Sequence, residues 1–263
     1  MEYSFFLPCA HSSSVTGILI DEAFKLKKEG KHVDIFYCDG YLKLCKSNYL
    51  GQKSKCESCK LKHRFLLKKY FNNENCFSLK EKAAENNLKN SLKEFNYSSV
   101  TEIKKLKYEN INVGLGCFST YVSLTRNSDP LFNDVFITYF NSLLNESIKM
   151  VQIAKKIINK ESDNIICLFN GRFFDSRPIV EYCSDNNINF RCYEAGITKD
   201  LKIKKLFYEN SLPHNMKAFA QKVNRYWEIN ETSVDKVQLA KDFFERKLQN
   251  KPVGDKVYTF NQV

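Results

Sequence analysis

The chain has 263 residues, which is enough for one large domain or two small ones and for a substantial buried core. Hydrophobic residues make up 43% of the sequence and aromatic residues 14%, which argues against a disordered protein. The formal net charge of +11 is compatible with an anionic partner such as nucleic acid, a nucleotide or an acidic membrane surface. The lysines are scattered among asparagines and isoleucines, however, which favours a solvated basic surface without a dedicated nucleic-acid site.

The sequence predicts neither a secretory leader nor a membrane span. Glu2 follows Met1 directly, without the charged and then apolar stretch of a signal peptide. The best candidate for a span, Ile111 to Leu124, is too polar and shorter than the ~20 residues that a bilayer requires. We therefore expect a cytoplasmic protein, either free or peripheral at the inner face of the membrane, with its ten cysteines mostly reduced.

The chain opens on a predicted strand-helix-strand unit. The first strand is Tyr3 to Leu7, and a helix with one apolar face follows from about Ser14 to Glu29. Gly30 suits the left-handed residue that ends a helix. The second strand, His32 to Tyr37, leads to Asp39. The unit is typical of the first half of a nucleotide-binding sheet, but without G-x-G-x-x-G it does not predict dinucleotide binding.

Residues 41 to 110 interrupt this alternation. They contain a cysteine-bearing segment, a lysine-rich helical stretch near 58–70 and a polar helical region near 78–107. We interpret them as an insertion that packs on the edge of the sheet. Residues 111–116 and a helix follow, and Asp129-Pro130 is predicted to start a long helix that ends near Lys160.

Residues 164–196 are the most informative stretch, because they predict a second strand-helix-strand unit. Ile165 to Phe169 is an apolar run too short for a helix, and Asn170-Gly171 ends it abruptly. A short helix with Pro178 in its first turn leads to the next strand, Asn189 to Tyr193. Two strands joined by a helix are almost always parallel, with a right-handed crossover.

The remainder is predicted to hold a short strand or loop at 201–208 and helices near 214–228 and 233–249. The last helix carries an apolar stripe that we assign to a core. Its members are Val234, Val237, Ala240, Phe244 and Leu248. We therefore predict a single α/β domain over residues 1–263, with a Rossmann-like parallel sheet flanked by helices and an inserted, helical, cysteine-containing segment at about 41–110.

Polar residues gather where the predicted parallel strands end. Open parallel sheets bind ligands beyond the carboxyl ends of their strands. We therefore expect a small polar ligand at this edge. The candidate residues are His11, Ser12 and Ser13 after the first strand, Asp39 after the second, Asn170, Gly171, Arg172 and Arg177 after the third, and Glu194 after the fourth.

His11, Glu194 and Asp39 are the candidate bases. His11 precedes Ser12 and Ser13 at a helix amino terminus, where free N–H groups and the helix dipole favour an anion. A histidine or a carboxylate there can accept the proton of a sugar hydroxyl. The alternative for His11 is a capping loop whose histidine faces solvent.

Asn170, Arg172 and Arg177 are the candidate binding residues. Arginine makes planar, bidentate contacts with carboxylate or phosphate, which suits charged sugars and diphosphate-linked acceptors. An alternative, compatible with binding, is that Arg177 pairs with Glu194 and braces the loop. Arg126 can approach the same edge from the preceding helix.

Cys45, Cys56 and Cys59 are candidate zinc ligands. Cys56-x-x-Cys59 is a zinc half-site by spacing, and Cys38 or His63 can complete four ligands. A second C-x-x-C is absent. Buried thiols or a disulfide are the alternatives, and any zinc is expected to be structural.

Six segments follow one another in a characteristic order: FFLPCAHSSS, FYCDG, the cysteine cluster, VGLGCFSTYVSLTR, FNGRFFDSRP and YEAG. This order resembles bacterial surface-polysaccharide (capsule-type) glycosyltransferases of the two-domain GT-B architecture. The resemblance covers most of the chain up to about residue 250, and FNGR followed by RP and E-x-G is its most specific part.

The resemblance implies a domain that binds a glycan or lipid-linked acceptor, while a second domain, absent here, binds the nucleotide-sugar co-substrate. It implies no required metal, because helix dipoles and basic side chains can stabilise the departing diphosphate. We therefore expect the acceptor-side half of a glycosyltransferase, which needs a donor-binding domain or partner chain for activity. The alternatives are a basic nucleic-acid-binding module and a non-catalytic partner subunit of a split glycosyltransferase.

Overall fold

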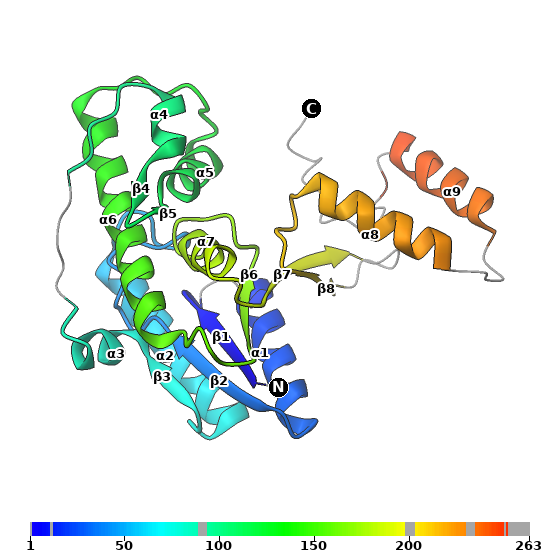
Figure 1. Ribbon diagram of the computed structural model, residues 1–263, viewed down its shortest axis with the longest axis horizontal. Coiled ribbons are helices and arrows are strands. Elements are labelled where there is room, and N and C mark those ends of the chain that lie inside the picture. The colour runs from blue at the N-terminus through cyan, green and yellow to red at the C-terminus, as the bar shows by residue number, and fades with distance from the viewer. Residues whose placement is uncertain are drawn as a thin grey trace.

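The computed structural model describes residues 2–10, 13–88, 94–197, 203–229, 235–249 and 251. Its centre is a six-stranded sheet in the order β3-β2-β1-β6-β7-β8, in which only β8 is antiparallel to its neighbour (Figure 1). The strands are β1 (Glu2–Leu7), β2 (His32–Tyr37), β3 (Cys76–Ser78), β6 (Asn164–Phe169), β7 (Phe190–Ile197) and β8 (Ile203–Glu209). The α/β, Rossmann-like prediction is confirmed.

Helices cover both faces of this sheet (Figure 1). The covering helices are α1 (Ser13–Lys28), α2 (Lys53–Phe71), α3 (Leu79–Glu85), α4 (Val100–Lys105), α5 (Gly114–Thr125), α6 (Asp134–Ile157) and α7 (Arg177–Asp185). Two further helices, α8 (Met216–Ile229) and α9 (Lys236–Leu248), follow β8. A small hairpin of β4 (Lys107–Tyr108) and β5 (Ile111–Asn112) precedes α5. In the residues that the structure describes, no helix has an apolar stretch long enough to cross a membrane.

The alternation of side chains along β1 divides the core into two layers. Phe5 and Leu7 pack with α1 and α2 on one face, whereas Phe6 packs with α3, α5, α6 and α7 on the other. Successive residues of a strand point to opposite faces, and every residue of β1 after Glu2 is buried, including the polar Ser4, so this central strand is covered on both sides. The short apolar run at the start of the chain therefore produces the middle of a three-layer fold.

Several predicted boundaries differ from the structure. The helix predicted from Asp129 begins at Asp134, because Asn133 caps it by accepting a hydrogen bond from the Phe136 backbone N–H at 3.0 Å. The insertion does more than cover the sheet edge, since it contributes β3.

β7 is longer than predicted. It continues past Tyr193 to Ile197 and pairs with β8 from Arg191 to Ile197. Glu194 therefore lies inside a strand and not just beyond its end.

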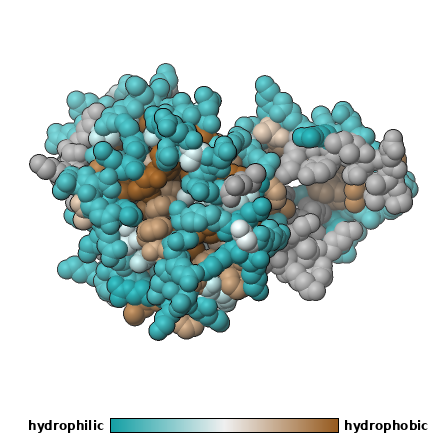
Figure 2. Space-filling model, turned by 60° about the horizontal axis from the view of Figure 1, so that its bottom comes forward, coloured by the Kyte–Doolittle hydropathy of each residue, from teal (hydrophilic) through white to brown (hydrophobic). Residues whose placement is uncertain are grey.

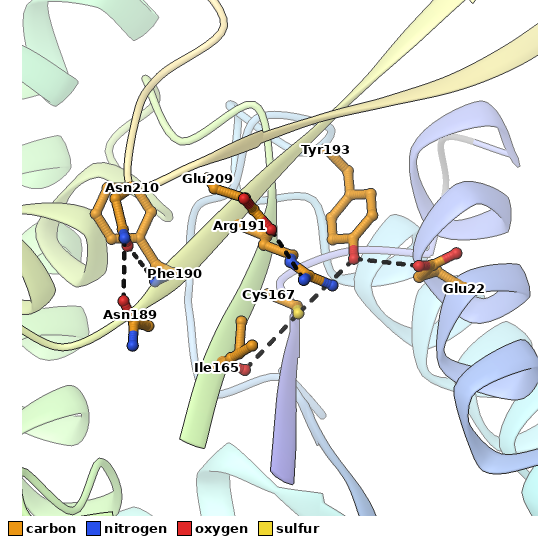
Figure 3. Close-up of polar contacts among 9 residues, drawn as sticks. All are labelled: Glu22, Ile165, Cys167, Asn189, Phe190, Arg191, Tyr193, Glu209 and Asn210. Carbon is orange, nitrogen blue, oxygen red and sulfur yellow. Dashed lines mark hydrogen bonds and ion pairs between the residues drawn. The ribbon is translucent and has the colours of Figure 1, made fainter. Parts of the chain in front are cut away.

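A polar network fixes β7 between α1 and β8 (Figure 3). The hydroxyl of Tyr193, which is fully buried, donates to Glu22 Oε1 of α1 at 3.5 Å. Arg191, two residues earlier on the same face, donates to Glu209 Oε1 of β8 at 2.9 Å. Burial raises the pKa of the Tyr193 phenol, so the hydroxyl stays protonated and remains a donor. β7 is thus held by polar contacts from both sides as well as by its strand partners.

The helices α8 and α9 form an arm that projects from the body of the molecule (Figure 1). The prediction that the α9 stripe faces a core is wrong. Phe244 is 65% exposed and Leu248 is 85% exposed, and α9 has no buried residue. Val234 lies outside the described residues.

Candidate functional site

The carboxyl ends of β1, β6 and β7 lie side by side, as the sequence predicted. Phe5 is in register with Cys167, and Phe169 is in register with Tyr193. The loop after β1 includes His11 and Ser12, which fall outside the described residues, as does the side chain of Ser13. The role predicted for these three residues therefore stays a prediction.

The side chain of Asn170, at the end of β6, contacts residues of β7 and of the turn after β8. It leaves β6 in the left-handed region (φ 62°), which asparagine tolerates better than most residues. Its backbone N–H donates to the Tyr193 carbonyl at 2.8 Å, and its side-chain amide donates to Glu194 Oε2. The same amide nitrogen lies 3.2 Å from Nε2 of His214. One buried amide thus holds a carboxylate and an imidazole together.

His214 is a site residue that the sequence did not predict. It lies in the turn between β8 and α8, after the end of β8 at Glu209. The antiparallel return of β8 brings it back to the carboxyl end of β6. Only the pairing of β7 with β8 places it there, and the sequence predicted merely a strand or loop at 201–208.

The cationic groups of Arg172 and Lys46 both lie over the aromatic ring of Phe173. The Arg172 guanidinium lies 4.7 Å from the centre of the Phe173 ring, and Lys46 Nζ lies 3.9 Å from it. Arg172 also donates to Ser123 Oγ of α5 at 3.2 Å. Cations are attracted to the face of an aromatic ring, so Phe173 fixes both side chains. We call Lys46, Asn170, Arg172, Glu194 and His214 the Asn170 cluster.

The basic groups of the Asn170 cluster are partly desolvated and lie close to other charged groups. Burial lowers the pKa of His214; Arg172 lowers it further and Glu194 opposes them. Burial also lowers the pKa of Lys46, while the carboxylate of Asp175 acts in the opposite direction. For Asp175, which is buried, desolvation raises the pKa and Lys46 counteracts it. Desolvation is the largest cause of all three shifts, and the neighbouring Arg172 adds to it for His214 and Lys46.

Two buried atoms of the cluster have no hydrogen-bond partner among the described residues. One is Oδ1 of Asn170, which can only accept, and the other is Nε of Arg172, which can only donate. Asn170 is only 5% exposed. Buried polar atoms are almost always satisfied, by protein, water or a ligand. A ligand with both hydroxyl groups and an anionic group matches this pair of atoms.

Arg177 does not join the cluster. It pairs with Glu181, one turn further along α7, so the predicted brace between Arg177 and Glu194 is wrong. The spacing i, i+4 within one helix offers that partner at less cost than a contact across the loop. Arg126 is exposed at the end of α5, and no contact recorded for the described residues brings its guanidinium to Asn170.

Gly171 and Asp39 contribute to the loops rather than to the cluster. Gly171 has φ 73°, and a Cβ there would lie 2.7 Å from Cys192 Sγ, so only glycine fits this exit from β6. Asp39, at the end of β2, lies 3.7 Å from Arg64 of α2 and accepts a 3.5 Å hydrogen bond from Ser78. Its described partners thus belong to α2 and β3, away from Glu194.

The predicted zinc ligands line a common cavity without forming a coordination shell. Cys45, Cys56, Cys59 and His63 border a space of about 20 Å³ next to β2. Within the described ranges, no three His, Cys, Asp or Glu side chains are arranged to hold a metal ion. Cys59 Sγ instead accepts a hydrogen bond from the Ala10 backbone at 3.0 Å. No disulfide joins any of the ten cysteines, and of the three candidate ligands Cys59 is a buried thiol whereas Cys45 and Cys56 are half-buried.

Comparisons with protein-family models, with curated proteins and with solved structures found no match to this chain. The functional argument therefore rests on the Asn170 cluster and its place at the carboxyl edge of the sheet.

Proposed function

We propose that the chain is the acceptor-side half of a glycosyltransferase that builds a surface glycan, and that the Asn170 cluster binds the acceptor. One observation carries the proposal: the unsatisfied acceptor of Asn170 and the unsatisfied donor of Arg172, both buried beside Glu194. A sugar supplies hydroxyl donors, and an acidic or phosphate-linked sugar also supplies oxygens for an arginine. The place of these groups, beyond adjacent parallel strands, is where open α/β sheets bind ligands.

Glu194 is the base that this geometry favours. Asn170 donates to Oε2, and the Ala195 backbone N–H donates to Oε1 at 3.0 Å, so the carboxylate is held in one orientation. In the proposed reaction, an acceptor hydroxyl loses its proton to Glu194 and attacks the anomeric carbon of a nucleotide-sugar. A new glycosidic C–O bond forms as the bond to the nucleotide diphosphate breaks, and the diphosphate leaves with the electron pair.

Arg172 and Lys46 would hold the anionic group of the acceptor. The two cations share the Phe173 ring, and Arg172 adds to the effect of burial in disfavouring the charge of Lys46. An anion placed between them relieves this repulsion. The nucleotide-sugar itself is assigned to a second domain or to a partner chain, with no metal required.

Ligand binding tests the proposal directly. We would titrate the purified chain with glucuronic acid, glucose 1-phosphate and neutral glucose by calorimetry. We expect the two anionic sugars to bind and Arg172→Ala to weaken them about tenfold or more, since a hydrogen bond to a charged group contributes ~1.5–3 kcal/mol. Arg225→Ala, on the exposed face of α8, is the matched control and should leave binding unchanged. Equal affinity in the two variants, or binding of none of these sugars, would contradict the proposed acceptor site.

Transfer activity requires a donor-binding partner in this proposal. Incubation of the chain with a nucleotide-sugar and an anionic acceptor is expected to give product only when a donor-binding chain or domain is added. Glu194→Gln should then abolish transfer while it retains acceptor binding. Activity that depends on the partner but not on Glu194 would favour a non-catalytic subunit.

A further inference from the structure

We propose that the arm formed by α8 and α9 is a binding surface for an anionic lipid bilayer. The proposal concerns an interaction surface made of residues other than those of the Asn170 cluster, and it does not depend on the sugar-transfer function. It rests on the exposed apolar faces of the two helices, on the hollow between them and on the charge around them.

The apolar residues of α8 form one stripe. Met216, Phe219, Val223 and Trp227 recur at intervals of three and four residues, which places them on one side of the helix. All four are more than 40% exposed. A helix whose apolar side faces water in this way loses the stabilisation that burial would give, about 25 cal/mol for each Å² covered.

The apolar residues of α9 repeat the pattern and meet the end of the α8 stripe. Val237, Ala240, Phe244 and Leu248 share one side of α9 and line, with Trp227, a hollow of about 440 Å³. In Figure 2 hydrophobic side chains are visible on the surface of the arm, which stands apart from the body. The two stripes therefore form a continuous apolar surface that the described part of the chain leaves open.

Basic residues outnumber acidic ones around this surface, with Lys236, Lys241 and Glu245 lining the hollow. The two helices, with Asp235 and Gln249 included, carry seven lysines and arginines against four acidic residues. Lys236 and Lys241 border the hollow, and Lys236 Nζ lies 5.1 Å from the centre of the Trp227 ring. Long lysine side chains beside an apolar face can reach the lipid headgroups while their stems stay in contact with the apolar layer. An amphipathic basic helix with Trp, Phe and Leu on its apolar face is typical of interfacial binding.

Charge also decides between a bilayer and a second copy of the chain. Two copies would bring together two arms of like charge on proteins with a formal charge of +11 each. An anionic bilayer offers the opposite charge, worth about 1 kcal/mol for each lysine or arginine near its surface. The apolar stripes are compatible with either occupant, so the charge complementarity favours the bilayer.

Trp227 allows a direct test, because it is the chain's sole tryptophan and is 48% exposed. We would record its fluorescence emission during titration with phosphatidylglycerol vesicles and with phosphatidylcholine vesicles. We expect a blue shift with the anionic vesicles only, quenching by brominated acyl chains, and loss of the shift as salt rises from 0.1 to 1 M, because the Debye length falls from ~10 to ~3 Å.

A matched pair of variants locates the surface. Phe244→Glu/Leu248→Glu removes two exposed side chains of α9 and should abolish sedimentation with anionic vesicles. Leu61→Glu/Phe65→Glu is the control, with the same residue types at the same i, i+4 spacing on α2 and exposures of 65% and 64%. The control should sediment as the unmodified chain does.

Four results would overturn the proposal. An equal blue shift with both kinds of vesicle would show that lipid charge plays no role. The absence of a blue shift with either kind would show that the arm does not bind a bilayer. Loss of binding in the α2 variant but not in the α9 variant would move the surface to α2. A blue shift that grows with protein concentration in the absence of vesicles would identify a second copy as the occupant of the arm.

Discussion

The side-chain amide of Asn170 donates to the carboxylate of Glu194 across the adjacent parallel strands β6 and β7. Asn170→Asp replaces that donor with a second carboxylate, but keeps a residue type that accepts the left-handed backbone. We expect a loss of about 1–3 kcal/mol in the free energy of unfolding at pH 7, as for a buried group left without its partner. Part of the loss should be recovered on acidification, when one of the two carboxylates is protonated.

Urea unfolding of the Asn170→Asp variant between pH 4 and pH 7 measures this effect. Asn187→Asp is the control, because Asn187 also has positive φ (56°) but is exposed after α7. It should unfold as the unmodified chain does at each pH. A pH-independent loss in Asn170→Asp would show that backbone conformation, and not the contact with Glu194, causes the destabilisation.

His214 should make the chain less stable in mild acid. Its pKa is lowered in the folded state, chiefly by burial and then by Arg172. A lowered folded pKa means that the unfolded chain binds the proton more readily. The resulting stability is present above the unfolded pKa of about 6.5 and is lost as pH falls through the folded pKa.

NMR titration of the imidazole resonances checks this prediction, since the chain has only four histidines. Arg172→Ala should raise the pKa of His214, because it removes the neighbouring cation. His214→Gln should flatten the dependence of stability on pH below the unfolded pKa of about 6.5, whereas His32→Gln, at the exposed start of β2, should leave the His214 titration unchanged. If Arg172→Ala leaves the pKa of His214 unchanged, the charge of Arg172 does not influence the imidazole and the prediction is wrong.

The parts of the fold that the sequence predicts well are those with local signals. β1, β2 and β6 are short apolar runs that end at polar or glycine-containing tips, and the observed strands agree with the predicted ones to within one residue. The meeting of Asn170 with Glu194 followed from the rule for parallel crossovers, although Glu194 belongs to a longer strand than expected.

The parts that the sequence does not predict depend on pairing between distant segments. β3 is only three residues long, which is too short to show a periodic pattern. β8 pairs antiparallel with β7 although the other strands of the sheet are parallel, and nothing in its sequence indicates that partner. A strand or loop was predicted at 201–208, but its antiparallel pairing with β7 was not, and His214 was missed with that pairing. A helical stripe also looks the same whether it faces a core or an external partner, which is why the α9 stripe was assigned wrongly.

Lys149 and Glu146 form an ion pair inside the molecule, with side-chain exposures of 8% and 6%. Glu146 also accepts a hydrogen bond from the Lys43 backbone at 2.9 Å, which ties the insertion to α6. Lys149→Met would leave the carboxylate buried without its counter-charge. We expect a cost of about 3–5 kcal/mol in the free energy of unfolding.

The double variant Glu146→Gln/Lys149→Met should recover much of that loss, because no charge remains buried and a glutamine can still accept from Lys43. Lys25→Met, in the exposed Lys25–Glu29 pair of α1, is the control and should change stability by no more than about 1 kcal/mol. Denaturant unfolding of the four proteins gives the comparison. A Lys149→Met variant as stable as the control would mean that the Glu146 carboxyl takes up a proton at little cost.

Gly114 and Gly17 should respond in opposite directions to alanine. A Cβ on Gly114 would lie 1.8 Å from the Ile103 carbonyl oxygen, so Gly114→Ala must push α5 away from α4. Gly17 is exposed in α1 with nothing within 4 Å of an added Cβ, and Gly17→Ala should stabilise the chain by up to ~1 kcal/mol through helix propensity. We expect Gly114→Ala to destabilise by about 1–3 kcal/mol, as overpacking does. Thermal unfolding of both variants tests the pair, and a neutral Gly114→Ala would mean that α4 moves freely relative to α5.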